Sequence, residues 1–215
     1  MKKSEQYTTG VLLALVGGFL DAYTYICRGH VFANAQTGNM ILFGIRLSER
    51  DWRGSLYYLV PIFAFVAGTT IAEWIRKKDE KVPMLHWRQV VLAIEIITLV
   101  LVGFLPLKTY DTVANVLVSF VCALQVQSFR KMEGKVYATT MCTGNLRSGT
   151  EYLIHSIEEQ DNEAFNVSIK YYGIIVMFIL GAIGGALLTG AMNQQSVWIS
   201  IIGLVIVFIR LFGEK

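Results

Sequence analysis

Residues 29–39 of this chain read Gly-His-Val-Phe-Ala-Asn-Ala-Gln-Thr-Gly-Asn, and a similar segment at residues 134–145 reads Gly-Lys-Val-Tyr-Ala-Thr-Thr-Met-Cys-Thr-Gly-Asn. Each copy begins with Gly-x-Val-aromatic-Ala and ends with Thr-Gly-Asn, and the second copy contains one inserted residue. A polar, glycine-containing motif repeated within an apolar sequence is typical of two related halves that build one site between them. The repeat therefore predicts a two-fold organisation of the chain.

The composition indicates an integral membrane protein. Of the 215 residues, 54% are hydrophobic and 16% are charged, and the mean hydropathy is +0.50. Soluble domains carry about 25% charged residues. Since a span needs about 20 apolar residues, the chain has room for about six spans joined by short loops. We expect a single membrane domain that comprises residues 1–215.

Several apolar runs are long enough to cross a hydrocarbon layer of about 30 Å. The predicted spans are about 9–27, 55–75, 89–106, 112–129, 168–190 and 196–212. The two motif segments, about 30–46 and 135–152, are apolar enough to enter a membrane but are interrupted by Gly, Asn, Thr and Gln. They could add two complete spans, giving eight, or they could be broken or re-entrant helices, leaving six.

The basic residues favour six spans. Lys and Arg near span ends concentrate on the cytoplasmic side of a membrane. A dense basic cluster runs from Arg76 to Lys81. Eight spans would place this cluster outside, whereas six spans place it inside, together with Lys2, Lys3 and Lys215. We therefore expect both termini to be cytoplasmic.

The two halves, about 9–106 and about 112–212, each contain three predicted spans and must therefore enter the membrane from opposite sides. The expected fold is an all-α integral membrane protein built from two inverted three-helix repeats, each with a broken or re-entrant Thr-Gly-Asn segment. Gly68, Gly181 and Gly185 lie among small residues at four-residue spacing, which lets helices approach closely in lipid. Helix packing accounts for these glycines, and the same small-residue faces could join copies of the chain in a homo-oligomer.

The two Thr-Gly-Asn triplets, at residues 37–39 and 143–145, could form one polar site near the middle of the membrane. The glycines permit a break in a helix, the threonines could cap a helix start, and the asparagines each bring a donor and an acceptor. Helix N-termini carry partial positive charge and free N–H groups, so two such ends would favour an anion. The predicted substrate-binding residues are Thr37, Gly38, Asn39, Thr143, Gly144 and Asn145, with Arg28 and Gln127 beside them.

Asp21 is the acid placed most deeply within a predicted span. A carboxylate at this depth is costly, and burial favours its protonated form. The preceding glycines let a neighbouring helix approach, and the second half has Gln127 at or near the equivalent place. A protonatable group that occurs in one half only suits a coupling proton, so we predict Asp21 as the proton-coupling residue. The alternative is a salt bridge from Asp21 to Arg28 or to a basic residue of the second half.

At these residues the sequence also resembles a known family, the YoaK-type family of small bacterial inner-membrane proteins, which is a domain of unknown function. The resemblance is carried by Gly18, Asp21, Ala22, Gly29, Phe32, the triplet 37–39, Gln127, Ser128, Arg130, Gly134, Thr139, Thr140, Thr143 and Gly144. It covers nearly the whole chain. It implies a multi-pass protein of the bacterial cytoplasmic (inner) membrane, and it supplies neither a substrate nor catalytic residues.

Enzyme chemistry has no support in the sequence. The chain contains no cluster of His, Cys, Asp and Glu at metal-ligand spacing, no glycine-rich phosphate loop and no serine with a nearby base. We therefore expect no catalytic site, no metal and no cofactor. A net charge of +3 spread over loops does not indicate nucleic-acid binding.

The leading hypothesis is a small-solute transporter with a midplane site for a small anion or a polar metabolite, whose transport could be coupled to protons. The expected partners are a small-molecule substrate and the lipid bilayer. One alternative is a passive channel lined by the two asparagines. Another is a membrane protein that binds partners without moving a solute, in which the triplets only hold helices together through asparagine hydrogen bonds.

Overall fold

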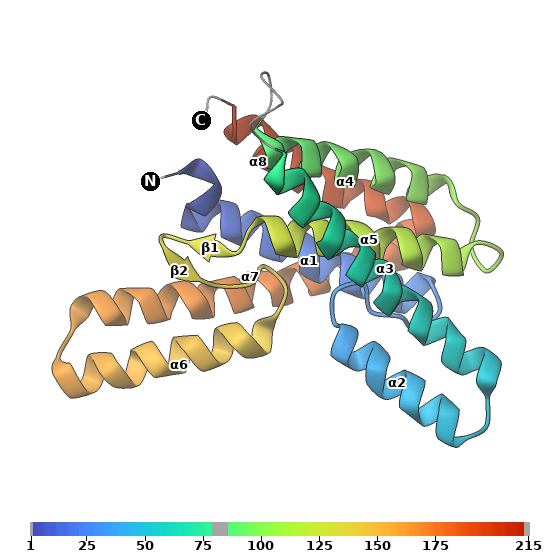
Figure 1. Ribbon diagram of the computed structural model, residues 1–215, viewed down its shortest axis with the longest axis horizontal. Coiled ribbons are helices and arrows are strands. Elements are labelled where there is room, and N and C mark those ends of the chain that lie inside the picture. Colours follow the sequence, from blue (N-terminus) through green and yellow to red (C-terminus); the bar gives the residue numbers. More distant parts are fainter. Residues whose placement is uncertain (1, 79–85, 213–215) are drawn as a thin grey trace.

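The computed structural model describes residues 2–78 and 86–212, and Figure 1 shows that these residues form an arrangement of helices with one small hairpin. The helices are α1 (Tyr7–Cys27), α2 (Gln36–Ser48), α3 (Trp52–Lys77), α4 (Trp87–Phe104), α5 (Asp111–Ser128), α6 (Cys142–Glu159), α7 (Asn162–Met192) and α8 (Val197–Arg210), with short 3-10 turns η1 (Lys3–Glu5) and η3 (Asn193–Ser196). The hairpin pairs β1 (Lys131–Met132) with β2 (Lys135–Val136) in antiparallel register. The predicted all-α class is confirmed.

Six of these helices, α1, α3, α4, α5, α7 and α8, overlap the six apolar runs that the sequence marks as spans. The largest difference is at the start of α7, which begins at Asn162 rather than at about 168. The reason is local, because the Asp161 side chain accepts a hydrogen bond of 2.7 Å from the Glu163 N–H and so caps an earlier start.

Four stretches of helix are long and apolar enough to cross a membrane, judged by length and composition: α1, α3, α4 and the continuous stretch Asn162–Arg210. The structure divides the last stretch at Asn193–Ser196 into α7 and α8. α5 is not among the four. Length and composition therefore indicate a multi-pass helical protein.

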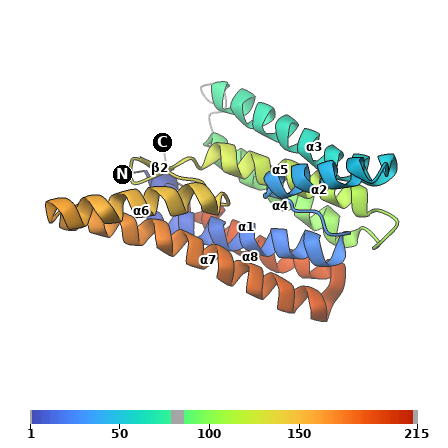
Figure 2. The same cartoon turned by 90° about the horizontal axis from the view of Figure 1, so that it is seen from below.

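The helix contacts of the two halves of the chain correspond. α1 packs against α7 and α8, while α5 packs against α3 and α4. In the same way α2 packs on α3 and α6 packs on α7, and α4 meets α8. Figure 2 shows α1, α7 and α8 lying together on one side, with α3, α4 and α5 on the other.

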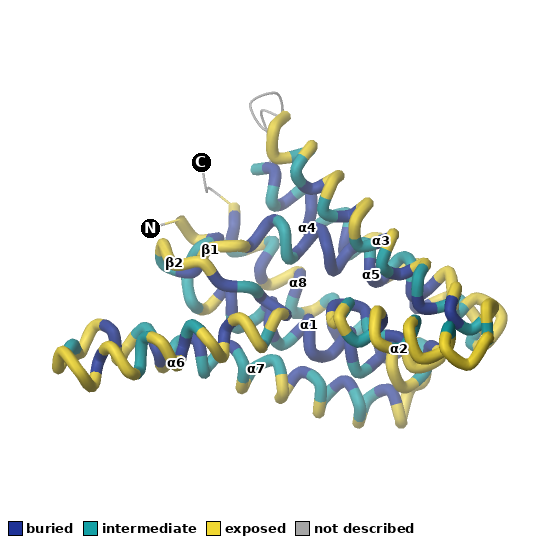
Figure 3. Tube along the Cα trace, turned by 60° about the horizontal axis from the view of Figure 1, so that its bottom comes forward, coloured by how far each residue is buried: buried dark blue, intermediate teal, exposed yellow. Residues whose placement is uncertain are grey.

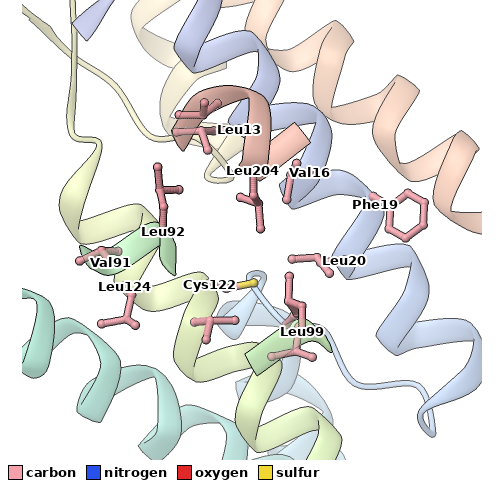
Figure 4. Packing of buried hydrophobic residues seen from close by; sticks show 14 of the residues in the cluster. Leu13, Val16, Phe19, Leu20, Val91, Leu92, Leu99, Cys122, Leu124 and Leu204 are labelled. Carbon is pink, nitrogen blue, oxygen red and sulfur yellow. The ribbon is translucent and has the colours of Figure 1, made fainter. Parts of the chain in front are cut away.

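The main apolar core lies between α1, α4, α5 and α8 (Figure 4). From α4 it receives Leu92, Leu99 and Val102, which are fully buried and recur at the spacing of one helix face. Leu20 of α1 and Leu204 of α8 belong to the same cluster. This core fixes α1 and α5. α7 packs on α1 and α3 packs on α5, and these two outer helices carry α6 and α2.

Glycines set the closest helix contacts, as predicted. A Cβ atom on Gly18 would collide with the carbonyl oxygen of Phe178, and one on Gly181 would collide with that of Leu15, so α1 and α7 touch through their backbones. Gly68 plays the same part between α3 and α5, where it faces the Phe120 carbonyl. The small-residue faces are therefore filled within the chain, and they are not available for the expected contact between two copies.

Large hydrophobic side chains are exposed on the outside of the bundle. Figure 3 shows exposed residues along the outer edges of α6 and α7 and of α2 and α3. On α7 alone the exposed large hydrophobic residues are Phe165, Ile169, Val176, Ile179, Leu180, Ile183, Leu187 and Met192. A soluble monomer rarely exposes a continuous apolar surface of this kind, whereas lipid covers it without cost.

Candidate functional site

Two helices, α2 and α6, begin in the interior of the molecule. The loops before them, residues 28–35 and 129–141, carry the chain back from the ends of α1 and α5. In Figure 1, α2 runs from the centre towards one end of the bundle, and α6 runs from the centre towards the opposite end. Both helices are shorter than α3 and α7, on which they pack. The two motif segments thus form helices with interior N-termini. We call them half-length helices, because each is about half as long as the helix on which it packs, α3 for α2 and α7 for α6.

The triplets occupy the same place in both helices. α2 starts at Gln36 and α6 starts at Cys142, so Thr, Gly and Asn are the second, third and fourth residues of each. The preceding residues, Ala35 and Met141, provide no side-chain cap. The expectation that the threonines cap these helices is therefore wrong, because they lie inside the first turn. The N–H groups of both first turns are left without a capping side chain.

The two asparagines fasten the loops that precede their helices. Asn39 Oδ1 accepts the Phe32 N–H at 3.1 Å, and Asn39 Nδ2 donates to the Phe32 carbonyl at 2.7 Å. Asn145 makes the same pair with Ala138, at 3.1 Å and 2.6 Å. Phe32 therefore corresponds to Ala138, so the inserted residue precedes this point. Asn39 does not line the central cavity described next, and Asn145 lines an adjoining pocket.

The first turns of α2 and α6 line one cavity of about 700 Å³. Thr37 and Gln36 contribute from α2, and Cys142, Thr143 and Gly144 contribute from α6. Apolar residues of α1, α3 and α7 form half of the remaining described wall, and the loops before α2 and α6 form most of the rest. Two helix N-termini that line one cavity direct their partial positive charges at the same place.

Asp21 lines this cavity and is the one charged side chain among its described lining residues. It is buried, and its Oδ1 accepts the Asn34 N–H at 2.7 Å. No ion pair involves Asp21 within residues 2–78 and 86–212, so the predicted alternative of a salt bridge with Arg28 is wrong. The carboxyl group is held by the loop in front of α2 and faces the space where a ligand would bind.

Two further polar groups line the cavity without a hydrogen-bond partner in the described structure. They are Asn34 Oδ1 and Thr140 Oγ1, which belong to residues that are 4% and 7% exposed. Each residue stands three positions before the threonine of its triplet. Gly17 makes room for Thr140, because a Cβ there would collide with its methyl group. Neither Asn34 nor Thr140 is among the predicted site residues, and Thr140 contributes only to the family resemblance, although their spacing from the two triplets relates them.

Two further pockets adjoin the cavity in turn, towards one end of the bundle. The first, of about 430 Å³, shares Phe65, Met141 and Gly144 with the cavity. The second, of about 330 Å³, shares Gln127, Arg130 and Val136 with the first. Gln127, predicted to bind substrate, thus lines both adjoining pockets rather than the cavity itself. Its side chain donates to Glu73 Oε2 at 3.1 Å.

Arg28, also predicted to bind substrate, is fully buried away from the cavity. Its guanidinium pairs with Asp111 at 3.2 Å and donates to the Leu105 carbonyl at 2.9 Å. Further bonds reach the Val102 carbonyl at 3.1 Å and the Tyr23 hydroxyl at 3.0 Å. A buried cation requires such partners, and here they tie the end of α4 to the end of α1. The prediction for Arg28 is corrected, because its donors are committed to this junction.

These features define an all-helical integral membrane protein with a polar interior and two half-length helices. The chain belongs to the family described as Protein of unknown function (DUF1275), whose model matches residues 9–210. It is similar to UPF0700 transmembrane protein YoaK of Bacillus subtilis (strain 168), with 25% identity over 215 residues that cover 95% of each chain. The resemblance to the YoaK-type family is thereby confirmed. No solved structure matches the chain.

Proposed function

We propose that this protein is a small-solute transporter whose binding site is the central cavity. The observation that carries the proposal is the convergence of two oppositely directed helix N-termini, with the free Asn34 and Thr140 oxygens, on one cavity. Unsatisfied polar groups of this kind bind a polar ligand or ordered water. The N-terminal turns favour a small anion or the negatively charged part of a polar metabolite.

An inverted repeat supports this proposal. We infer that α1–α4, within residues 9–106, and α5–α8, within residues 112–212, are two repeats with α2 and α6 as the re-entrant segments. Each repeat then supplies three crossings. The contact of α1 with α7 matches that of α5 with α3, the contact of α1 with α8 matches that of α5 with α4, and the contact of α2 with α3 matches that of α6 with α7. α5 counts as a crossing because its polar residues, including Asn115, Ser119 and Gln125, are buried inside the bundle rather than exposed to lipid.

The distribution of basic residues supports cytoplasmic termini. The end of the bundle that carries the start of α1 and the end of α8 also carries the hairpin and the end of α3 (Figure 1). Its described basic residues include Lys2, Lys3, Arg76, Lys77, Lys78, Arg88, Arg130, Lys131, Lys135, Lys170 and Arg210. Such an excess is typical of the cytoplasmic side. Lys81 and Lys215, which belong to the same expectation, lie outside the described residues.

Proton coupling through Asp21 follows from the same geometry. An ionised Asp21 would repel an anion in the cavity and would also hold the Asn34 N–H. Protonation removes the repulsion, so anion binding and proton binding strengthen each other by the same factor. A solute and a proton would therefore move together.

Reconstituted vesicles test the proposal. A thermal-shift screen against small metabolite anions first identifies a ligand, because binding to the native state raises the melting temperature. Uptake of that ligand is then measured with and without an imposed pH gradient. Uptake that does not change with the imposed pH gradient would indicate a passive channel. The absence of any flux would favour a membrane protein that binds partners without moving a solute.

Gly144 offers a second test, because it lines both the cavity and the adjoining pocket. A Cβ atom on Gly144 meets nothing within 4 Å, so Gly144→Leu should fold and obstruct the path. Gly190→Leu on α7 is the matched control, since its Cβ position is equally open and does not line the cavity. Full uptake by the Gly144→Leu protein would contradict the proposed path.

A further inference from the structure

The pocket at the basic end of the bundle has a lining that differs from that of the central cavity. It measures about 330 Å³ and lies between the ends of α3 and α5, the start of α4 and the hairpin. Among its described lining residues four are cations, namely Arg76, Arg88, Arg130 and Lys131, and one, Glu5, is an acid. The pocket is thus electropositive, whereas Asp21 is the charged residue that lines the cavity.

Two of the four cations are already engaged by the protein. Arg76 donates to both oxygens of Glu73, at 3.0 and 2.5 Å. Arg88 Nε donates to the Ser128 carbonyl at 2.9 Å, and its guanidinium lies 4.8 Å from the centre of the Trp87 ring. These contacts fix both side chains at the wall of the pocket and keep their positive charges beside it.

The other two cations, Arg130 and Lys131, form no ion pair with any residue in the ranges 2–78 and 86–212. Both are exposed at the rim of the pocket, at the beginning of the hairpin. Two unpaired cations beside two fixed ones repel each other, and an anion between them would relieve this repulsion.

A buried hydroxyl provides independent evidence of a ligand. Ser128 lines the pocket, its residue is 2% exposed, and its Oγ has no hydrogen-bond partner in the described structure. Buried hydroxyl groups nearly always have a partner. A hydroxyl that lines an electropositive pocket can donate to an oxyanion that the cations attract.

We propose that this pocket binds a phosphate group, either free in solution or in the headgroup of an anionic lipid. Phosphate offers several acceptor oxygens for the planar forks of arginine, for a lysine and for a hydroxyl. Basic pockets between helices at the cytoplasmic side of a membrane are a known setting for lipid phosphates. The site stands on its own observations and does not depend on transport through the central cavity.

The test uses the full-length protein and two probes. Inorganic phosphate is titrated into the detergent-solubilised protein by calorimetry. Retention of phosphatidylglycerol is measured by native mass spectrometry after purification from nanodiscs that contain either phosphatidylglycerol with phosphatidylcholine or phosphatidylcholine alone. The double variant Arg130→Gln/Lys131→Gln removes the two unpaired charges, and Lys135→Gln is the matched control on the same hairpin, outside this pocket.

We expect the double variant to bind the phosphate probe at least about tenfold more weakly, since two charge-assisted contacts are lost. Lys135→Gln should change binding less than about twofold, and Ser128→Ala should also weaken it while the protein stays folded. Binding of inorganic phosphate identifies the soluble source, and retention of phosphatidylglycerol alone identifies the lipid. Binding of neither probe, or equal losses in the double variant and in Lys135→Gln, would overturn the proposal.

Discussion

The Asn39 side chain forms two hydrogen bonds with the backbone of Phe32: its Oδ1 accepts the N–H at 3.1 Å and its Nδ2 donates to the carbonyl at 2.7 Å. This pair of bonds fixes the loop before α2 to the first turn of that helix. Asn145 repeats the arrangement with Ala138, also seven residues earlier. The asparagines thus act on the loop before each half-length helix. The first-turn threonines, rather than the asparagines, line the cavity.

Alanine at either asparagine should destabilise the protein. Asn39→Ala and Asn145→Ala each leave two backbone groups without a partner, which costs about 1–3 kcal/mol. Because the two bond pairs are equivalent, the losses should agree within about 1 kcal/mol, as measured by denaturant unfolding in detergent. Asn166→Ala, at an exposed asparagine of α7, is the control and should change stability by less than about 0.5 kcal/mol. Unaltered stability of Asn145→Ala would contradict the proposed role.

The contact between α1 and α7 should depend on glycine at particular positions. Gly18→Ala places a methyl group against the Phe178 carbonyl, and Gly181→Ala places one against the Leu15 carbonyl, so each should lower stability by about 1–3 kcal/mol. Gly184→Ala adds its methyl group to open space on the same helix. It should be neutral or stabilise by up to about 1 kcal/mol, because alanine restricts the unfolded chain. Equal melting temperatures for Gly18→Ala and Gly184→Ala would argue against backbone contact.

The arrangement of helices could be predicted from the sequence because hydropathy and span length report directly on burial in lipid. The apolar runs located α1, α3, α4, α5, α7 and α8, and the interruptions by Gly and Asn marked α2 and α6 as different. The start of α7 was predicted too late in the sequence, because a single capping residue, Asp161, determines where the helix begins.

The roles of individual polar residues could not be predicted in the same way. Whether Arg28 binds a ligand depends on how the connection between α4 and α5 folds around it, and sequence spacing does not contain that information. The threonines were placed at the wrong helical position because the lengths of the preceding loops determine where α2 and α6 begin. Asn34 and Thr140 align through the sequence of the triplets, but only the folded structure shows that both line the cavity without a hydrogen-bond partner in the described residues.

Arg28 should be essential for folding rather than for ligand binding. Arg28→Gln leaves the Asp111 carboxylate without its cation and removes bonds to the end of α4, and breaking a buried pair of this kind costs about 3–5 kcal/mol. Arg46→Gln breaks an exposed pair with Glu49 and should cost less than about 1 kcal/mol. Thermal unfolding of both variants measures the difference. A stable Arg28→Gln protein with weakened ligand binding would instead support the original prediction that Arg28 binds substrate.

Asp21→Asn should separate solute binding from proton coupling. Asparagine keeps an oxygen that can accept the Asn34 N–H, so the loop before α2 should stay in place. The variant can neither ionise nor carry a proton, so it should exchange solute across vesicles at about the wild-type rate but fail to accumulate solute under a pH gradient. Glu95→Gln is the control, because Glu95 is fully buried without a hydrogen-bond partner in the described structure and does not line the cavity. Unchanged accumulation by Asp21→Asn, or its loss in Glu95→Gln instead, would remove Asp21 from the coupling role.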